Sequence, residues 1–321
     1  MGKTKTQAAW LIEKIRFLSD CREKFAGSGP TIEYGPHTLL KLICVSYYAE
    51  MFAKIAKGEK ARTQGYDGAI YLDLFAGPGI VTIKGPGDRV AGSPIAAICA
   101  AKIPFDHSVL IESNPERGSA LLKRLSTFLS PNTFTVIRGD CNRELKRVTS
   151  LIKDRWKKPI ILIFVDPEGM EAKWETIEHL SQNFPNIDFM INLTSGISRV
   201  AGRIVSGIES DMPIFEDFFG NNAGSILVKA THGQPVAKQY ELGIRDVLGK
   251  PMGATIPIND ESGRLVYQLL AYTRLSLTGS PWANGFETLQ KRLGGVDGKL
   301  ALNALNVIKG RQQVLPHFLQ S

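Results

Sequence analysis

Residues 69–79 read AIYLDLFAGPG, an apolar run that ends in a carboxylate and then breaks into a glycine turn. Glycine at positions 77 and 79 can adopt positive φ and lets the backbone approach a ligand closely. The stretch therefore predicts a buried strand whose carboxyl end feeds a ligand-binding loop. On these residues alone, a tight strand-to-helix connection without a ligand is the alternative.

From residue 69 onward, strand-like runs alternate with helix-like segments, a pattern typical of a parallel sheet with crossover helices. The predicted strands cover 69–74, 108–112, 134–138, 160–165, 189–193 and, later, 265–273. One helix opens near Ser93-Pro94, with Ser93 as N-cap and Pro94 in the first turn. The other predicted helices cover about 115–129, 142–156 and 174–180. We expect an α/β fold with a doubly wound, mostly parallel, Rossmann-like sheet.

Helical segments flank this core. Residues 7–25 and 37–57 carry apolar side chains at helical spacing, and a polar linker follows at 58–68. We divide the chain into an N-terminal helical segment (1–63) packed on the core, an α/β domain (64–280) and a C-terminal helical segment (281–321). Within the α/β domain, residues 197–260 break the alternation and predict a helical insertion after strand five, with one helix near 235–248.

The bulk composition narrows the class of protein. The chain has 321 residues, of which 43% are hydrophobic and 22% charged, as in an ordinary globular protein. No window approaches 18 uninterrupted apolar residues, and the N-terminus lacks the apolar centre of a secretion signal. We expect a cytoplasmic protein that does not enter a membrane.

The cysteines and histidines do not form a metal-binding pattern. Four cysteines, at positions 21, 44, 99 and 141, lie far apart, and the five histidines are equally scattered. We expect reduced cysteines and no metal site.

The net charge of +8 favours a polyanionic partner, although a basic protein without such a partner can carry the same charge. Between strands three and four lie seven cations that form either a solvated helix face, the commoner case, or a nucleic-acid track: Arg143, Lys146, Arg147, Lys153, Arg155, Lys157 and Lys158. Arg199 and Arg203 are better candidates for substrate contact because they follow strand five.

Each of the first four predicted strands ends at an acidic residue: Asp73, Glu112, Asp140 and Asp166. In a doubly wound sheet, ligands bind beyond the carboxyl ends of the strands, where the strand order reverses. Four acids at one edge suggest a ligand that is rich in hydroxyls and amines or that carries positive charge.

This arrangement resembles the class I S-adenosylmethionine-dependent methyltransferase fold over roughly residues 69–196. The resemblance implies S-adenosylmethionine as cofactor, with its methionine end at Asp73 and the glycine turn, both ribose hydroxyls on Glu112, the adenine amino group at Asp140 and the acceptor at Asp166. The implied cofactor-binding set is Asp73, Phe75, Ala76, Gly77, Gly79, Ser93, Pro94, Glu112, Ser113, Asp140 and Cys141, and the implied catalytic set is Asp166, Pro167 and Glu168.

A nicotinamide dehydrogenase is the competing interpretation of a glycine loop followed by an acid. The gap from Gly77 to Glu112 is 35 residues, longer than the usual spacing of about 20. In addition, Phe75 stands at the first glycine position of the dinucleotide motif. The methyltransferase interpretation treats residues 80–91 as an insertion and also uses Asp140 and Asp166.

A narrower resemblance rests on several motifs taken together: HTLLK at 37–41, DLFAGPG at 73–79, GSP at 92–94, IESN at 111–114 and DPEG at 166–169 with Trp174. In these the chain is similar to the three-Cys-motif partner protein family, which implies a methyltransferase-type domain that works beside a second protein. Trp174 either covers the site or packs its helix on the sheet.

The sequence specifies the methyl acceptor less closely than the cofactor. Enzymes that methylate amino groups of adenine or cytosine typically show Asp-Pro-Pro-Tyr, whereas here Glu168 and Gly169 follow Asp166-Pro167. Asp-Pro-x-Gly is closer to what tRNA guanine N2-methyltransferases show, so a guanine or other RNA acceptor fits no worse than DNA adenine. We expect RNA or DNA as substrate. The sequence predicts a methyltransferase for a nucleic acid or nucleotide-like acceptor. A non-catalytic S-adenosylmethionine- or nucleoside-binding partner subunit of another enzyme is the alternative, and the oligomeric state is left open.

Overall fold

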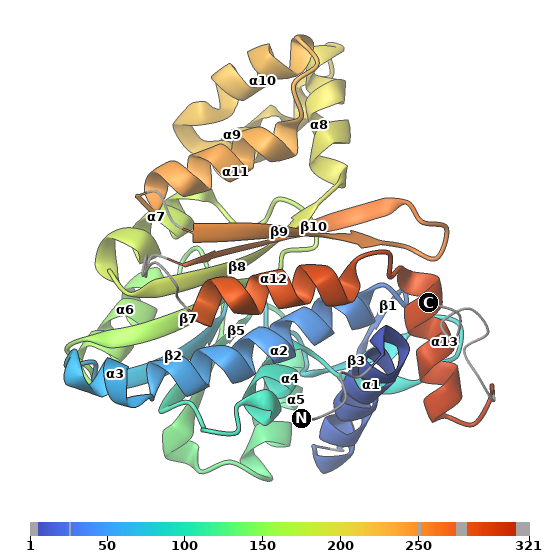
Figure 1. The fold of residues 1–321 in the computed structure, drawn as a ribbon. Helices are drawn as coiled ribbons and strands as arrows, with labels where there is room; N and C mark the ends of the chain where they lie inside the picture. The colour runs from blue at the N-terminus through green and yellow to red at the C-terminus, as the bar shows by residue number, and fades with distance from the viewer. Residues whose placement is uncertain (1–5, 26, 250–251, 274–280, 313–321) are drawn as a thin grey trace.

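The structure is a computed structural model that describes residues 6–25, 27–249, 252–273 and 281–312. At its centre lies a seven-stranded sheet (Figure 1). Its strands, in spatial order, are β6 (Phe134–Arg138), β5 (His107–Glu112), β2 (Gly68–Asp73), β7 (Pro159–Val165), β8 (Ile187–Thr194), β10 (Leu265–Thr273) and β9 (Met252–Asn259).

Strand direction and order confirm the predicted fold class. Strand β10 is antiparallel to both of its neighbours, and the other neighbouring pairs in this sheet are parallel. From β2 the chain first builds outward through β5 to β6, and then returns to the other side of β2 with β7 and β8. The strand order therefore reverses between β2 and β7, and their carboxyl ends mark the topological switch point.

Helices cover both faces of the sheet, because successive residues of a strand point to opposite sides. Ala69 and Tyr71 of β2 belong to one apolar core, and Ile70 and Leu72 belong to the other. The first core is completed by α1 (Gln7–Lys24), α2 (Thr38–Ala56), α4 (Ser93–Ala100), α5 (Pro115–Ser126), α12 (Pro281–Leu293) and α13 (Gly298–Ile308). The second is completed by α6 (Leu145–Lys153), α7 (Trp174–Asn183) and the inserted helices described below.

Helix α2 lies deep in this architecture. It packs against α4 and the sheet, and Tyr48 at its centre is fully buried. The Tyr48 hydroxyl donates a hydrogen bond of 2.5 Å to the carboxylate of Asp188 on β8. The N-terminal segment is thus an integral part of the core, and its first turn reaches the carboxyl edge of the sheet.

A second, small sheet adjoins the first. It contains β1 (Ile32–Tyr34), β3 (Ile80–Ile83) and β4 (Arg89–Ala91), with β1 parallel and β4 antiparallel to β3. The insertion expected at 80–91 is therefore a hairpin that directly follows the glycine turn. These short strands were not predicted, because three or four residues are too few for a visible period of two.

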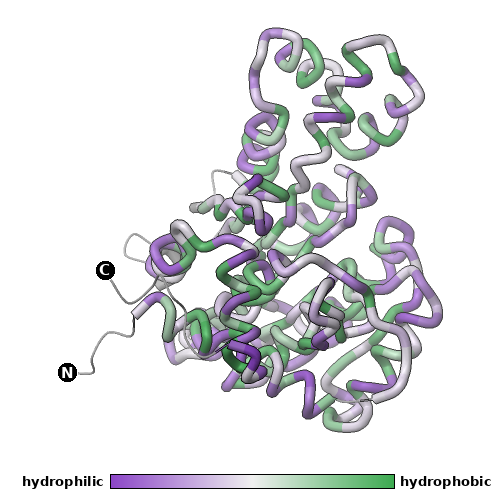
Figure 2. The backbone as a smooth tube through the Cα atoms, turned by 90° about the vertical axis from the view of Figure 1, so that its right-hand side faces the viewer, coloured by the Kyte–Doolittle hydropathy of each residue, from purple (hydrophilic) through white to green (hydrophobic). Residues whose placement is uncertain are grey.

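Four helices form a cap that projects from the body (Figures 1 and 2): α8 (Gly196–Val205), α9 (Met212–Phe219), α10 (Ala223–Thr231) and α11 (Val236–Val247). They enclose an aromatic cluster of Phe215, Phe218, Phe219 and Tyr240. The expected end of the insertion at residue 260 was wrong, because β9 belongs to the main sheet. This edge strand contains Gly253 and Pro257, which weaken the strand pattern in the sequence.

Other expected boundaries also need correction. The linker predicted at 58–68 contains α3 (Glu59–Thr63), and short 3₁₀ turns occur at Pro131–Thr133, Glu209–Asp211 and Gly220–Asn222. Gly92, rather than Ser93, is the N-cap of α4. The Ser93 hydroxyl is unable to cap because it binds a buried carboxylate.

Trp174 packs the cap onto the body and does not cover a site. Its side chain is buried, and a Cβ added at Gly220 or Gly243 would approach its ring atoms to 2.6 Å and 2.8 Å. The indole therefore lies between the end of α9 and the middle of α11.

The division into three segments stays a prediction, and its boundary at residue 280 falls outside the described ranges. Among the helices that the structure describes, none combines the length and the apolar character needed to cross a bilayer.

The buried Asp188 carboxylate predicts a pH effect on stability. Burial raises its pKa to about 7, although hydrogen bonds from Tyr48 and Thr273 oppose the rise. The carboxyl group of Asp188 therefore holds its proton more tightly in the folded protein than in the unfolded chain. Its contribution to the free energy of unfolding falls as the pH rises from about 4 to 7, by at most about 1.4 kcal/mol per pH unit.

We expect Asp188→Asn to remove this contribution. In urea unfolding at pH 5 and pH 7.5, the variant should lose less free energy of unfolding than the wild-type protein as the pH rises. Identical losses in the two proteins would contradict the assignment.

Candidate functional site

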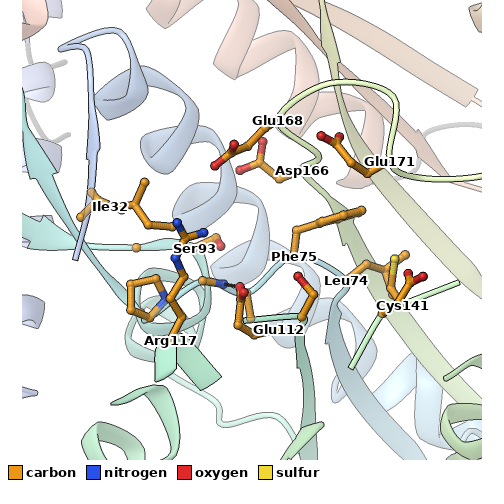
Figure 3. Close-up of a pocket in the computed structure, with 18 of the residues that line it drawn as sticks. Ile32, Leu74, Phe75, Ser93, Glu112, Arg117, Cys141, Asp166, Glu168 and Glu171 are labelled. Carbon is orange, nitrogen blue, oxygen red and sulfur yellow. Dashed lines mark hydrogen bonds between the residues drawn. The ribbon is translucent and has the colours of Figure 1, made fainter. Parts of the chain in front are cut away.

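A pocket of about 580 Å³ opens at the carboxyl ends of β2, β5, β6 and β7 (Figure 3). This is the edge where the strand order reverses. Its walls come from the loops after these four strands, from β1 and the first turns of α2, and from α9 of the cap. The N-terminal segment and the insertion therefore both reach the site that the central strands define.

The glycine turn forms one wall. Gly77 and Gly79 have φ values of 60° and 79°, the region that favours glycine. A Cβ at Gly79 would lie 2.7 Å from the Leu121 side chain of α5. The carbonyl of Pro78 accepts a hydrogen bond of 2.5 Å from Arg124, also on α5. The loop is thus pinned from behind by α5, and its open side faces the pocket.

Asp73 holds this loop from beneath. Its carboxylate is fully buried and accepts hydrogen bonds from the Tyr71 hydroxyl (3.0 Å), the Ser93 hydroxyl (2.8 Å) and the Phe75 amide (3.2 Å). Burial raises its pKa to about 7, while these hydrogen bonds act in the opposite direction. Asp73 is not among the lining residues, so in this structure it positions the loop.

Glu112 lies at the pocket wall beside the loop. Its two carboxylate oxygens accept one backbone amide each, from Gly77 at 2.8 Å and from Asn114 at 2.8 Å. A carboxylate offers about four acceptor positions, so Glu112 can accept further hydrogen bonds from a ligand. The same contact fixes the position of the glycine loop.

The loop after β6 supplies Asp140 and Cys141. Asn142 was not predicted as a site residue, yet it braces this region. Its amide group donates to Asp140 at 2.9 Å and to the Glu171 carbonyl at 2.8 Å, and its oxygen accepts from the Lys173 amide at 3.0 Å. It thereby ties the loop after β6 to the loop after β7.

The loop after β7 presents Asp166 and Glu168, which lie side by side in the close-up (Figure 3). Lys41 of α2 donates to both oxygens of Asp166, at 3.0 Å and 2.7 Å, and Asn192 of β8 donates to one of them at 2.7 Å. The rings of Tyr34 and Tyr267 lie 5.3 Å and 5.4 Å from the Lys41 ammonium. This cluster joins the N-terminal segment to Asp166 at the end of β7.

Lys41 was not predicted as a site residue. Its only signal was its place in the HTLLK motif at 37–41, and nothing in that motif indicates which residue faces the sheet edge.

Acidic groups dominate the pocket. Six carboxylates line it, from Glu112, Asp140, Asp166, Glu168, Glu171 and Asp217, against three cations, Lys41, Arg117 and Lys173. The chain as a whole has a net charge of +8. The pocket therefore concentrates negative charge in a basic protein and suits a ligand with positive groups.

Most of the sequence-predicted residues meet at this pocket. The lining includes Phe75, Ala76, Gly77, Gly79, Ser93, Glu112, Ser113, Asp140, Cys141, Asp166 and Glu168, whereas Asp73, Pro94 and Pro167 are not part of it. Arg199 and Arg203 on α8 also lie outside the lining, and Arg203 forms an ion pair with Asp211.

In the described part of the chain, no group of three or more His, Cys, Asp or Glu side chains is arranged to hold a metal ion.

Comparisons with known proteins give only distant similarity. No family model and no curated protein matches the chain. A crystal structure of a protein from Legionella pneumophila is 15% identical with a TM-score of 0.43, covering 76% of this chain and 92% of its own. The O-methyltransferase from Bacillus cereus in complex with SAH is 9% identical with a TM-score of 0.39, covering 82% of this chain and 90% of its own.

The M. jannaschii protein TYW2 in complex with AdoMet is 12% identical with a TM-score of 0.32, covering 68% of this chain and 78% of its own. Similarities this low carry no argument about function.

The Lys41–Asp166 pair gives a prediction about stability. We expect Lys41→Met to lower the free energy of unfolding by about 1–3 kcal/mol, because it leaves a largely buried carboxylate without its charged partner. In a double-mutant cycle by chemical denaturation, adding Asp166→Asn should recover part of this loss.

Lys173→Met is the matched control. Lys173 pairs with Asp217 at 2.8 Å, but the two side chains are 44% and 51% exposed. Such a pair contributes about 0–1 kcal/mol. Equal losses for the two lysine variants would show that the Lys41 pair has no special role.

Proposed function

We propose that this protein is an S-adenosylmethionine-dependent methyltransferase that acts on a nucleic acid or nucleotide-like acceptor beside a partner protein. One observation carries the proposal: at the switch point, a single acid-lined pocket contains a glycine turn bonded to Glu112 and, on its other side, Asp166 and Glu168. A binding wall and a candidate acceptor wall thus share one cavity.

The residues present fit the cofactor. A Cβ at Gly77 would point toward the pocket residue Ile32, so its absence lets a ligand approach the backbone there. At Gly79 the absence of a Cβ lets the loop pack closely on Leu121 behind it. Glu112 retains acceptor positions for two neighbouring hydroxyls, as a ribose offers. The acid-rich lining suits the sulfonium and ammonium charges, and a volume of about 580 Å³ lies within the range of small-molecule sites.

When bound, the cofactor would supply an electrophilic methyl group: an acceptor atom would attack the methyl carbon in line with the breaking carbon–sulfur bond, and S-adenosylhomocysteine would be the leaving group. The chain then has to orient the acceptor and accept or release one proton. Asp166 is held by Lys41 and Asn192, so its carboxylate is fixed before an acceptor binds. Glu168 is exposed, receives a 3.4 Å hydrogen bond from Tyr34 and stands beside Asp166 as a candidate proton acceptor.

The acceptor class and the partner rest on weaker support. The net charge of +8 favours a polyanion such as RNA or DNA. Arg199 at the start of α8 is exposed and close to the end of β8. The motif resemblance to the three-Cys-motif partner family supports a second protein, and cap helix α9 places Ile214 and Asp217 where substrate specificity is usually built.

A non-catalytic nucleoside-binding subunit is the second candidate. It is favoured by the state of Asp166, whose oxygens are already bonded by Lys41 and Asn192. A carboxylate used for structural support is less available to an acceptor.

Glu112 gives the first test of cofactor binding. We expect Glu112→Gln to weaken S-adenosylhomocysteine binding, measured by isothermal titration calorimetry, by about 10-fold or more, because a hydrogen bond to a charged group contributes about 1.5–3 kcal/mol. Glu116→Gln, on the exposed first turn of α5, should bind as the wild-type protein does. Absence of any binding to the wild-type protein would contradict the proposal.

Asp166 separates the two candidates. If the protein is a methyltransferase, transfer of tritiated methyl groups to RNA or DNA occurs in the presence of its partner, and Asp166→Ala abolishes it while S-adenosylhomocysteine binding persists. Normal nucleoside binding without methyl transfer to any nucleic acid, with or without the partner, would support the non-catalytic subunit instead.

A further inference from the structure

Arg117 lines the pocket from the start of α5, next to the glycine loop. It lies in the first turn of α5, and Leu121 and Arg124 follow it at positions i+4 and i+7 on the same helix face. That face packs on the glycine loop, through Leu121 against Gly79 and through Arg124 to the Pro78 carbonyl. The Arg117 side chain lines the pocket and extends from the helix past this loop toward Ile32 and Glu168 (Figure 3).

Arg117 differs from the other two cations of the pocket in its partners. Lys41 is bonded to Asp166, and Lys173 is paired with Asp217. The Arg117 backbone amide is capped by Asn114, but its guanidinium forms no hydrogen bond or ion pair with any residue that the structure describes. The residue is only half exposed. A partly desolvated guanidinium with free donors is well suited to a planar oxyanion, which it can bind through two parallel hydrogen bonds.

The rest of the lining limits which oxyanion can bind. Six carboxylates surround the pocket, so an anionic ligand group is tolerated only beside the available cation. Glu112 bonds to Gly77, and Arg117 shares its helix face with residues that contact Gly79 and Pro78. A diol-binding acid and a carboxylate-binding cation therefore adjoin the same loop. Together they match a ligand that carries both a ribose and an amino acid.

We propose that Arg117 binds the α-carboxylate of the cofactor's amino-acid moiety and thereby makes the pocket selective for nucleosides that bear an amino acid. The proposal rests on the proposed function, because it assigns one residue of the same site. A phosphate group of the acceptor is also an oxyanion that a guanidinium binds. The test below distinguishes that ligand from the carboxylate.

The test compares two ligands that differ in the amino-acid moiety. S-adenosylhomocysteine contains the carboxylate, and 5′-methylthioadenosine lacks it. By isothermal titration calorimetry, Arg117→Gln should weaken S-adenosylhomocysteine binding by about 10- to 100-fold, as expected for a lost charge-assisted hydrogen bond, and should leave 5′-methylthioadenosine binding within about 2-fold. Arg117→Lys should fall between wild type and Arg117→Gln. Lys123→Gln, on the outward face of the same helix, should change neither affinity.

The possible results separate clearly. Equal weakening of both ligands would overturn the proposal, since it would mean that Arg117 only supports the loop. Unchanged binding of both ligands would also overturn it, and weaker RNA or DNA binding in that case would assign Arg117 to an acceptor phosphate. If the wild-type protein binds neither nucleoside, the proposed function itself fails. A thermal melt of each variant shows whether the fold is retained.

Discussion

The buried carboxylate of Asp73 is the constraint around which the site is organised. A carboxylate without water is costly, so every nearby donor is used to satisfy it. The donors are Tyr71 on the same strand, Phe75 in the loop and Ser93 at the start of α4. These bonds join β2, the glycine turn and α4 at one point. The direction in which the chain leaves the strand, and hence the wall of the pocket, follows from them.

The N-terminal segment offsets the charge that the strand ends bring together. Parallel strands place their carboxyl ends at one edge, and acids there repel one another unless cations intervene. Helix α2 supplies Lys41 to Asp166 at this edge. Its buried Tyr48 binds Asp188, the second residue of β8, and so anchors the helix to the sheet away from this edge. A segment that precedes the sheet in the sequence therefore completes the site in space. Lys41 thereby fixes Asp166, the acid after β7, in the same loop as Glu168.

The cap and the body share one apolar core, and specific contacts fix how they meet. Trp174 fits against Gly220 and Gly243, where a larger residue would collide with its ring. The Lys173–Asp217 ion pair lies one residue away in sequence and joins the same two parts. Through these contacts α9 brings Ile214 and Asp217 to the pocket. The cap, which is inserted after β8, can thus contribute to substrate choice without altering the sheet.

The sequence by itself determined the order of the central parallel strands and of the helices between them, the glycine turn at Gly77–Gly79 and the acids at four strand ends, because apolar periods and turn residues are local properties of the chain. Only the tertiary structure decided the rest. The edge strand β9 forms by pairing with β10. Its strand pattern in the sequence is far weaker than that of a central strand. Three site residues were not predicted, because no local pattern specifies which side of their helix or loop faces the pocket: Lys41, Asn142 and Arg117. Asp73 and Glu112 look alike as strand-end acids, yet one is buried beneath the loop and the other lines the pocket, because the direction of a side chain at a sheet edge depends on the helices packed around it.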